Sequence, residues 1–377
     1  MGLSIDHISL HNFRSYADFE LGGLGGLTVL VGPNAAGKTN VVEAVQLVTA
    51  LSSFRHPTIE ELVREGESSA RVRARITGDG RLLEVEMAID EGRRRWLLNG
   101  KGKHAADLKG TLPSVVFTPD DLELAKGSMG KRRTALDDLG SQLSKNHYLI
   151  KKDYEKVLQH KNRLLKDEAE PALIDSVDDL VVTCGAQLCA YRSALFLRVA
   201  PKMEECYAEI SGGRESLQAC YVPSWEDYDP AVPASFSFGK QEARESLAGA
   251  LEARRGEERE RRRALVGPQL DKIDFFLDGR NVTSYASQGQ QRSVVLAFKL
   301  AEAAVVQDVL GQKPVMLLDD VMSELDSARR RALVDFMSSG VQTIVTSTNL
   351  SYFDPDMLAR AQIVELPRAG AGEGELS

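Results

Sequence analysis

Cysteine is scarce in this sequence, and its spacing argues against the usual cysteine chemistry. The 377 residues hold four cysteines: Cys184, Cys189, Cys206 and Cys220. None of them forms a Cys-x-x-Cys pair, which disfavours a structural zinc site and thioredoxin-like redox chemistry. We therefore expect free thiols kept in a reducing compartment, which favours a cytoplasmic protein.

Long apolar runs and an excess of positive charge are also missing. No stretch approaches the roughly 18 uncharged apolar residues that span a bilayer, and the first residues lack the layout of a signal peptide, so we expect no membrane partner. Asp and Glu total 55 against 47 Lys and Arg, for a net charge of −8. This excludes a polybasic protein that coats DNA. It leaves room for a local basic surface, because phosphate attraction acts within a Debye length of roughly 8–10 Å.

The hydrophobic pattern indicates α/β structure at both ends of the chain. The alternating residues 4–13 and the short apolar run 27–31 are typical of strands. Residues 38–51 predict a helix, and residues 70–100 predict antiparallel hairpins with glycine turns. The length of the chain allows about two domains, or one large domain with an insertion.

From about residue 122 to residue 263 the strand pattern mostly disappears. Helical spacing predicts three long helices in this segment: 147–166, 172–210 and 240–263. Strands return after residue 264, and two later apolar runs predict buried strands at 315–318 and 343–346.

Residues 32–39, Gly-Pro-Asn-Ala-Ala-Gly-Lys-Thr, match the phosphate-loop pattern of glycine, four residues and Gly-Lys-Ser/Thr. They follow a predicted strand and precede a predicted helix, which disfavours the alternative of a chance glycine-rich turn. We expect Lys38 to reach the β- and γ-phosphates of ATP and to act in catalysis, and Thr39 to bind Mg²⁺. The predicted nucleotide contacts are Gly32, Pro33, Asn34, Ala35, Ala36, Gly37, Lys38, Thr39 and Asn40.

Two aspartates follow the apolar run 315–318. Nucleotides bind at the carboxyl ends of parallel strands, so we expect Asp319 to hold the metal, directly or through water. Asp320 faces the other way and would act in catalysis by orienting or deprotonating the attacking water. Most apolar runs followed by two aspartates are simply strands that end in an acidic turn. A phosphate loop in the same chain favours the ATPase interpretation here.

A second phosphate site is predicted at Ser287. Ser287 and Gln290 have the spacing of a capping box, so a helix should begin here and continue over 293–309. The start of a helix offers free N–H groups and about half a positive charge. A plain capped helix is the alternative for this motif alone. A two-fold dimer would instead hold ATP between the phosphate loop of one subunit and Ser287, Gly289 and Gln290 of the other, with Ser287 also catalytic.

Two segments near the acidic pair complete the predicted site. Residues 323–326, Ser-Glu-Leu-Asp, are candidates for the dimer interface. Thr346 and Thr348 end a predicted strand and are candidates for sensing the γ-phosphate. The alternative, that they are ordinary hydroxyl residues at a strand end without a role in binding, fits the sequence equally well.

Together these motifs resemble the RecF family of bacterial recombination-repair ATPases, which belongs with the ABC-type ATPases related to the chromosome-maintenance (SMC) proteins. The matching segments run nearly from end to end: 10–16, 32–39, 116–122, 287–302 and 318–326. The resemblance implies an α/β fold, an ABC-type phosphate-loop ATPase head with an antiparallel β-hairpin subdomain and a helical insertion. It divides the chain into the N-terminal half of the head, the helical insertion and the C-terminal half of the head: 1–121, 122–263 and 264–377.

The resemblance also implies a function. A RecF-like protein would be an ATP- and Mg²⁺-dependent homodimer that closes on single/double-strand DNA junctions or gapped DNA and reopens after slow hydrolysis. It would act in recombinational repair and replication, with RecO and RecR as partners in loading recombinase. Arg14, in the first matching segment, would contact the nucleotide; the alternative is a surface arginine after a strand.

Two segments depart from the family pattern. Where the family commonly has Gly-Pro-His-Arg-Asp-Asp, residues 267–272 read Gly-Pro-Gln-Leu-Asp-Lys, and residues 51–57 lack the usual basic form. These departures leave open a divergent member that acts as a nucleotide-gated scaffold without a repair role. The hairpins and the serine–glutamine motif disfavour a transporter ATPase subunit. The short insertion without a cysteine pair disfavours a long coiled-coil chromosome ATPase.

Basic residues gather in four clusters: Arg71, Arg73 and Arg75; Arg93, Arg94 and Arg95 with Lys101 and Lys103; Lys131, Arg132 and Arg133; and six arginines between 254 and 263. Alternation puts the first three arginines on one strand face, which predicts a stripe that binds phosphates. The last cluster is interleaved with glutamates, which favours a solvated helix face. No aromatic residues interleave with these clusters, so we expect DNA to be recognised by its shape and backbone.

Overall fold

The structure of the protein is a computed structural model, which describes residues 2–229 and 235–367. Contacts within the chain separate it into two compact units. Unit 1 comprises Met1–Asp120 and Val306–Ser377, and unit 2 comprises Asp121–Val305. Residues 264–305 therefore fall in unit 2, whereas the sequence pattern assigns them to the C-terminal half of the head.

Unit 1 contains a five-stranded parallel sheet with the strand order β14-β3-β13-β12-β8. Its strands are β3 (Leu27–Val31), β8 (Ser114–Phe117), β12 (Val315–Asp319), β13 (Thr343–Ser347) and β14 (Gln362–Glu365). The central strands β13 and β12 are buried along their whole length, as expected for parallel strands covered on both faces. Because parallel strands point the same way, the segments that follow β3 and β12 leave the sheet at the same edge.

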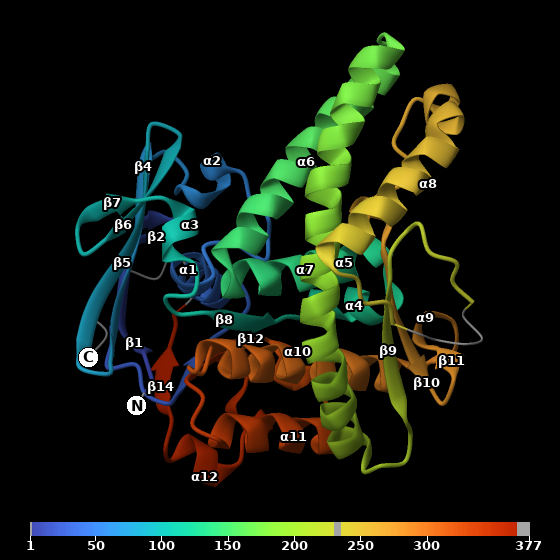
Figure 1. Ribbon diagram of the computed structural model, residues 1–377. Coiled ribbons are helices and arrows are strands. Elements are labelled where there is room, and N and C mark those ends of the chain that lie inside the picture. Colours follow the sequence, from blue (N-terminus) through green and yellow to red (C-terminus); the bar gives the residue numbers. More distant parts are fainter. Residues whose placement is uncertain (1, 230–234, 368–377) are drawn as a thin grey trace. The chain divides into compact units, whose positions relative to one another are not determined.

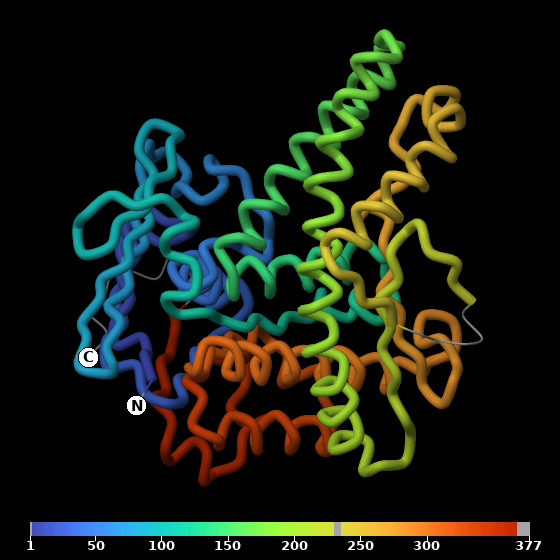
Figure 2. Tube along the Cα trace, in the orientation of Figure 1, coloured from blue at the N-terminus to red at the C-terminus, as the bar shows by residue number. Residues whose placement is uncertain are grey.

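A six-stranded antiparallel sheet forms the other layer of unit 1, in the order β2-β1-β4-β5-β6-β7. Its strands are β1 (Ser4–Phe13), β2 (Tyr16–Gly22), β4 (Ser69–Gly78), β5 (Arg81–Asp90), β6 (Arg93–Leu98) and β7 (Lys101–Lys103). Figures 1 and 2 show β4 and β5 side by side, which confirms the predicted hairpins. Along β4 the apolar side chains are buried and the arginines between them are exposed, as a strand with one covered face requires.

Helix α1 joins the two sheets of unit 1 because it contacts strands of both of them. It begins at Lys38, directly after the phosphate loop, and ends at Thr49. Its valines face a common apolar core and are at most 2% exposed. The remaining helices of the unit are short or peripheral: α2 (Ile59–Leu62), α3 (Ala105–Leu108), α11 (Ser327–Ser338) and α12 (Pro355–Leu358).

Unit 2 is mostly helical. It contains α4 (Glu123–Lys126), α5 (Met129–Leu143), α6 (Lys145–Lys166), α7 (Pro171–Ser211), α8 (Lys240–Arg261) and α9 (Val282–Tyr285). The three long helices predicted from the sequence are confirmed, with ends that differ by a few residues at most. Helix α10 (Gln288–Leu310) begins in unit 2 and ends in unit 1. The long helices α6 and α7 lie side by side (Figure 1).

Unit 2 contains a small antiparallel sheet, in which the strand after residue 264 is predicted by the sequence pattern and the strand before residue 264 is not. Its strand order is β11-β10-β9, with β9 (Leu217–Val222), β10 (Lys272–Leu277) and β11 (Arg280–Asn281). Strand β9 lies inside the segment expected to be helical. It is stabilised by pairing with β10, which is distant in the sequence, and local periodicity carries no information about such a partner.

Among the described residues, one helix is long and apolar enough to cross a membrane by length and composition, namely α7. The structure buries 56% of its most apolar window. Val181, Cys189 and Val199 are fully buried, and α7 contacts α6, α8 and β9. We therefore interpret α7 as the core helix of unit 2.

A buried charge cluster holds α6, α7 and α8 together. Lys161 on α6 is 0% exposed. Its Nζ forms ion pairs with Asp178 Oδ1 on α7 at 2.7 Å and with Glu258 Oε2 on α8 at 2.6 Å. Because a buried ammonium that loses one partner costs about 3–5 kcal/mol, this cluster fixes the three helices to one another.

Candidate nucleotide-binding site

The phosphate loop lies between β3 and α1 in unit 1, as its sequence predicts. Gly37 is the residue before α1 and has φ 90°, a left-handed conformation that favours glycine. A Cβ atom there would also lie 2.5 Å from Tyr16 Oη. The same hydroxyl donates to the carbonyl of Ala36 at 3.3 Å. Tyr16 thus packs directly on the loop and forbids any larger residue at position 37.

Lys38 is only 7% exposed, and its ammonium group lies within the loop. Nζ donates to the carbonyl oxygens of Gly32 at 2.7 Å and Pro33 at 2.8 Å. Burial lowers the pKa of Lys38, while the carboxylates of Asp320 and Asp319 oppose this shift. The structure therefore brings the predicted lysine and the predicted acidic pair into electrostatic contact.

Thr39, Asp319 and Thr346 form one hydrogen-bonded cluster. The hydroxyls of Thr39 and Thr346 donate to Asp319 Oδ1 at 3.0 and 2.8 Å. Thr346 Oγ1 also accepts from the backbone N–H of Asp320 at 2.9 Å. A hydroxyl and a carboxylate in contact are oxygen ligands of the kind that Mg²⁺ prefers, so Thr39 and Asp319 fit the predicted metal site.

The position of Thr346 changes its interpretation. Its side chain is fully buried and bonded to both aspartates, so it positions the acidic pair. Thr348, the residue that follows the end of β13 at Ser347, is exposed. Of the two candidates for sensing a phosphate, Thr346 is buried against the acidic pair and Thr348 is exposed, so the role of Thr348 stays a prediction.

Asp320 has two unusual features. It has φ 55°, a left-handed conformation that is rare for residues other than glycine. Its Oδ1 is buried without a hydrogen-bond partner. Burial raises the pKa of Asp320, against the opposing charge of Lys38. Strained backbone and unsatisfied buried carboxylates concentrate at functional sites, which makes Asp320 the strongest candidate for the catalytic base.

The serine–glutamine motif lies in unit 2 and forms the predicted capping box. Ser287 N donates to Gln290 Oε1 at 2.7 Å, and Gln290 N donates to Ser287 Oγ at 3.2 Å. Helix α10 begins at the next residue, Gln288. Ser287 and Gln288 are exposed, whereas Gly289 and Gln290 are half-buried. The start of α10 is therefore open to a ligand, as a phosphate site requires.

Arg14 is engaged with a side chain of the protein. Its Nε and Nη2 donate to the two carboxylate oxygens of Glu43 at 2.9 and 2.8 Å. Glu43 is fully buried and also accepts from Ser53 and Arg55. The next residue, Ser15, accepts from Asn40 at 2.9 Å. The segment around Arg14 thus supports α1, while a nucleotide contact by Arg14 itself stays a prediction.

Comparisons with known proteins support the motifs. Residues 4–362 match the family described as RecF/RecN/SMC N terminal domain. The DNA replication and repair protein RecF of Synechococcus sp. (strain JA-3-3Ab) is 36% identical over 367 residues, covering 95% of each chain. The chain belongs to the RecF family. A solved structure of the recombination mediator protein RecF-ATPrS in the RecFOR pathway is 29% identical, with a TM-score of 0.85 over 94% of each chain.

A more distant structure supports the fold alone. The Smc head domain of Pyrococcus furiosus, solved with the C-terminal domain of ScpA, has a TM-score of 0.53 at 17% identity and covers 96% of this chain. The predicted fold class, an ABC-type ATPase head of the RecF and SMC kind, is thereby confirmed.

In this RecF-family chain, the divergent loop 267–272 is anchored through Asp271. Asp271 Oδ2 accepts from Arg192 at 3.1 Å and from Tyr221 Oη at 2.6 Å. Arg192 also donates to both carboxylate oxygens of Asp137, at 2.8 and 2.7 Å. The loop therefore joins a fully buried network that links α5, α7 and β9.

This network makes stability depend on pH. Burial raises the pKa of Asp271 from 3.8 to about 6, although Arg192 and Tyr221 oppose the shift. The folded protein binds this proton more tightly than the unfolded chain, so the associated stability is present below pH 3.8 and is lost as pH rises through about 6. Between these values we expect the wild type to lose roughly 3 kcal/mol relative to Asp271→Asn, which does not titrate.

Urea unfolding of both proteins at several pH values between 4 and 7 measures this difference. The exposed Asp179→Asn on α7 is the control, and it should keep the pH dependence of the wild type. A free-energy difference between wild type and Asp271→Asn that stays constant over this range would contradict the prediction.

Two of the predicted basic clusters are engaged within the protein. On β4, Arg73 pairs with Glu86 at 2.9 Å and Arg75 with Asp6 at 2.6 Å, so the predicted phosphate stripe is a row of ion pairs. Arg132 is 2% exposed and bonded to Asp274, which removes it from the surface. Periodicity places a side chain on a face without showing the acidic partner opposite, so these ion pairs are not predicted, and phosphate binding by the β4 arginines stays a prediction.

The remaining two clusters, like the arginines of β4, are on the surface. On α8, arginines pair with glutamates one turn away, for example Arg254 with Glu257, and the arginine side chains of these pairs are exposed, which confirms the predicted solvated helix face. On the hairpin β6–β7, Arg93, Arg94, Lys101 and Lys103 are exposed. This hairpin therefore presents basic side chains outward, as the exposed arginines of β4 also do.

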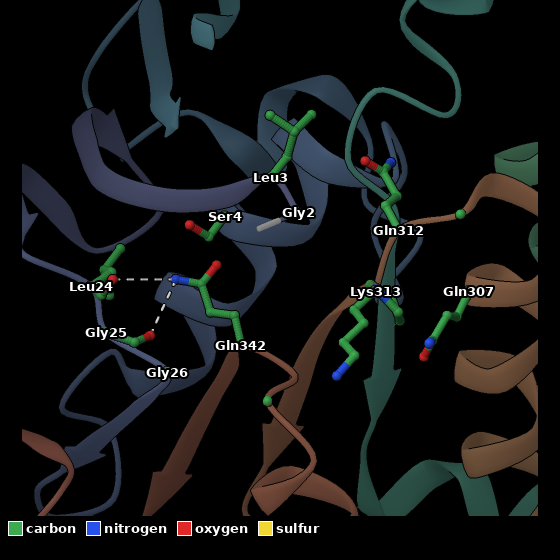
Figure 3. A pocket seen from close by; sticks show the side chains of 13 residues that line it. Gly2, Leu3, Ser4, Leu24, Gly25, Gly26, Gln307, Gln312, Lys313 and Gln342 are labelled. Carbon is green, nitrogen blue, oxygen red and sulfur yellow. Dashed lines mark hydrogen bonds between the residues drawn. The ribbon is translucent and has the colours of Figure 1, made fainter. Parts of the chain in front are cut away.

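A cavity of about 610 Å³ in unit 1 lies at the other edge of the parallel sheet (Figure 3). It is lined by residues that precede strands, including Gly26 before β3, Pro314 before β12 and Gln342 before β13. The Gln342 amide donates to the carbonyls of Leu24 and Gly25 there. The phosphate loop and the acidic pair follow the carboxyl ends of the same strands, so this cavity is separate from the predicted nucleotide site.

Proposed function

We propose that this RecF-family protein is an ATP-dependent DNA-binding ATPase of recombinational repair and replication, acting in the cytoplasm. One observation carries the proposal: Lys38, Thr39, Asp319 and Asp320 meet at one edge of the parallel sheet, and a buried oxygen of Asp320 has no hydrogen-bond partner. This is the arrangement that phosphoryl transfer to water requires, with a cation for the phosphates and a carboxylate for the proton.

Each residue has a proposed role. The phosphate loop, residues 32–40, holds the triphosphate through its backbone N–H groups, and Lys38 contacts the β- and γ-phosphates. Mg²⁺ held by Thr39 and Asp319 would neutralise charge on the phosphate oxygens. Asp320 accepts a proton from the attacking water, and its raised pKa suits a base. Its side chain is shorter than the glutamate of the wider ABC class, which predicts slow hydrolysis.

We further propose that the working site forms between two copies of the chain. The start of α10 is exposed and built as an anion site, and it would complete the nucleotide site of a second copy through Ser287, Gly289 and Gln290. Binding of ATP then closes the homodimer, and hydrolysis reopens it.

DNA and two protein partners complete the proposal. A close structural relative is described as a recombination mediator in the RecFOR pathway, so RecO and RecR are the proposed partners, and single/double-strand junctions or gapped DNA the proposed substrate. The exposed basic residues of β6–β7 are the proposed phosphate contacts.

Mixing two inactive variants tests the shared site. Lys38→Ala removes the lysine of the phosphate loop. Ser287→Arg places a large side chain at the start of α10 and blocks it. A mixed dimer retains one intact site, formed by the loop of the second variant and the α10 start of the first. With DNA present we expect about a quarter of wild-type ATP turnover, because about half of randomly mixed dimers are mixed and each has one of two sites.

A second mixture is the matched control. Lys38→Ala with Asp320→Asn should stay inactive, because both residues belong to the same half-site in unit 1 and no intact site results. If the first mixture is no more active than its components, although both variants fold, the proposal of a site shared between copies is wrong.

A further inference from the structure

Glu215 connects the predicted signature motif to the core helix of unit 2. It lies in the short segment between the end of α7 at Ser211 and the start of β9 at Leu217. Its side chain is half-buried and lines a cavity of about 440 Å³. Nothing in the sequence motif around Ser287 indicates a partner so far away along the chain.

The two carboxylate oxygens of Glu215 bind different elements. Oε1 accepts from the side-chain amide of Gln290 at 2.6 Å, and Oε2 accepts from Tyr207 Oη on α7 at 2.6 Å. Both contacts are short, as expected for hydrogen bonds to an ionised acceptor. The carboxylate is thus a bridge between the last turns of α7 and the first turn of α10.

This bridge fixes the orientation of the Gln290 amide. Because its nitrogen donates to Glu215, its oxygen is turned toward the backbone, where it accepts from Ser287 N at 2.7 Å. Without Glu215 the amide could rotate, and the capping box would lose one of its two hydrogen bonds. The position of Ser287 therefore depends on a residue beyond the motif.

We propose that Glu215 is a positioning residue for Ser287, holding the start of α10 in the conformation that receives the terminal phosphate of a second copy. Through Tyr207, the same carboxylate makes this conformation depend on the end of α7. The inference rests on the proposed function of Ser287 and Gln290, and it adds the element that controls them.

Exchanging the two partners tests the proposal. In Gln290→Glu, two carboxylates face each other and repel, so DNA-stimulated ATP turnover should fall about tenfold or more, because a hydrogen bond to a charged group is lost. In the double variant Glu215→Gln with Gln290→Glu, the new amide donates to the new carboxylate and still accepts from Tyr207. Turnover should return to within about threefold of wild type.

Further measurements separate positioning from folding. Binding of fluorescent ATP to the monomer should be unchanged in every variant, because the phosphate loop is intact, and the melting temperature monitors the fold. The control is Glu204→Gln, a carboxylate that lines the same cavity but accepts only weakly, from Ala219 N at 3.4 Å; its turnover should equal that of wild type.

Two outcomes would overturn the proposal: full turnover by Gln290→Glu, or a double variant no more active than Gln290→Glu alone. Either result, obtained while the mixture of Lys38→Ala and Ser287→Arg regains turnover, rejects the role of Glu215 and leaves the shared site standing. Failure of that mixture would reject the shared site independently.

Discussion

Replacement of Lys38 by alanine is expected to abolish retention of ATP and, with it, ATP-dependent binding of DNA. The Lys38 ammonium is buried in the phosphate loop beside the acidic pair. Hydrogen bonds from such a charged group to phosphate oxygens contribute about 1.5–3 kcal/mol each, so we expect the affinity for ATP to fall by about 100-fold or more. Titration with fluorescent ATP and a gel-shift assay on gapped DNA measure the two losses.

Lys313→Ala is the matched control for this experiment. Lys313 also belongs to unit 1 and donates to the Ser339 carbonyl, but it lines the cavity at the other edge of the sheet. Both affinities should stay at the wild-type level. Full ATP-dependent DNA binding by Lys38→Ala would show that DNA binding is not coupled to the phosphate loop.

Asp320→Asn is expected to stop turnover while leaving ATP bound. Asparagine keeps the size of the side chain but cannot accept a proton, so the rate should fall on the order of 10²–10⁴-fold, the usual contribution of a general base. The contacts of Asp319 and Thr39 are unaffected, so nucleotide should still bind. With ATP and Mg²⁺ the variant should therefore accumulate as a dimer.

Release of phosphate and gel filtration measure these two effects. The control is Asp335→Asn, an exposed aspartate on α11, which should behave as wild type in both assays. An Asp320→Asn protein that remains monomeric with ATP and Mg²⁺ would count against closure of a dimer by nucleotide.

The parts of the site that could be predicted are those encoded locally. The phosphate loop needs glycine at position 37 because the backbone there has a positive φ, and the capping box joins residues three apart. Each motif can therefore be recognised in a short stretch of sequence. The contact between Thr39 and Asp319 follows in turn, because parallel strands deliver both segments to one edge.

What the sequence could not reveal depends on partners distant along the chain. Strand β9 is stabilised by pairing with β10, and the arginines of β4 form ion pairs with Glu86 and Asp6. Glu215 is the clearest example, since its role comes from meeting Gln290 across 75 positions. Periodicity describes one element at a time and says nothing about which element packs against it.

The length of α7 has a mechanical consequence. With 41 residues it extends for about 60 Å, at about 1.5 Å per residue, as a single rod. Near its beginning, Asp178 pairs with the ammonium of Lys161 on α6. Just beyond its end, Glu215 accepts a hydrogen bond from Gln290 on α10. Pro201 interrupts the backbone hydrogen bonding between these two anchors, so bending under load should concentrate there. A displacement of one end of α7 would therefore tilt the other end about Pro201.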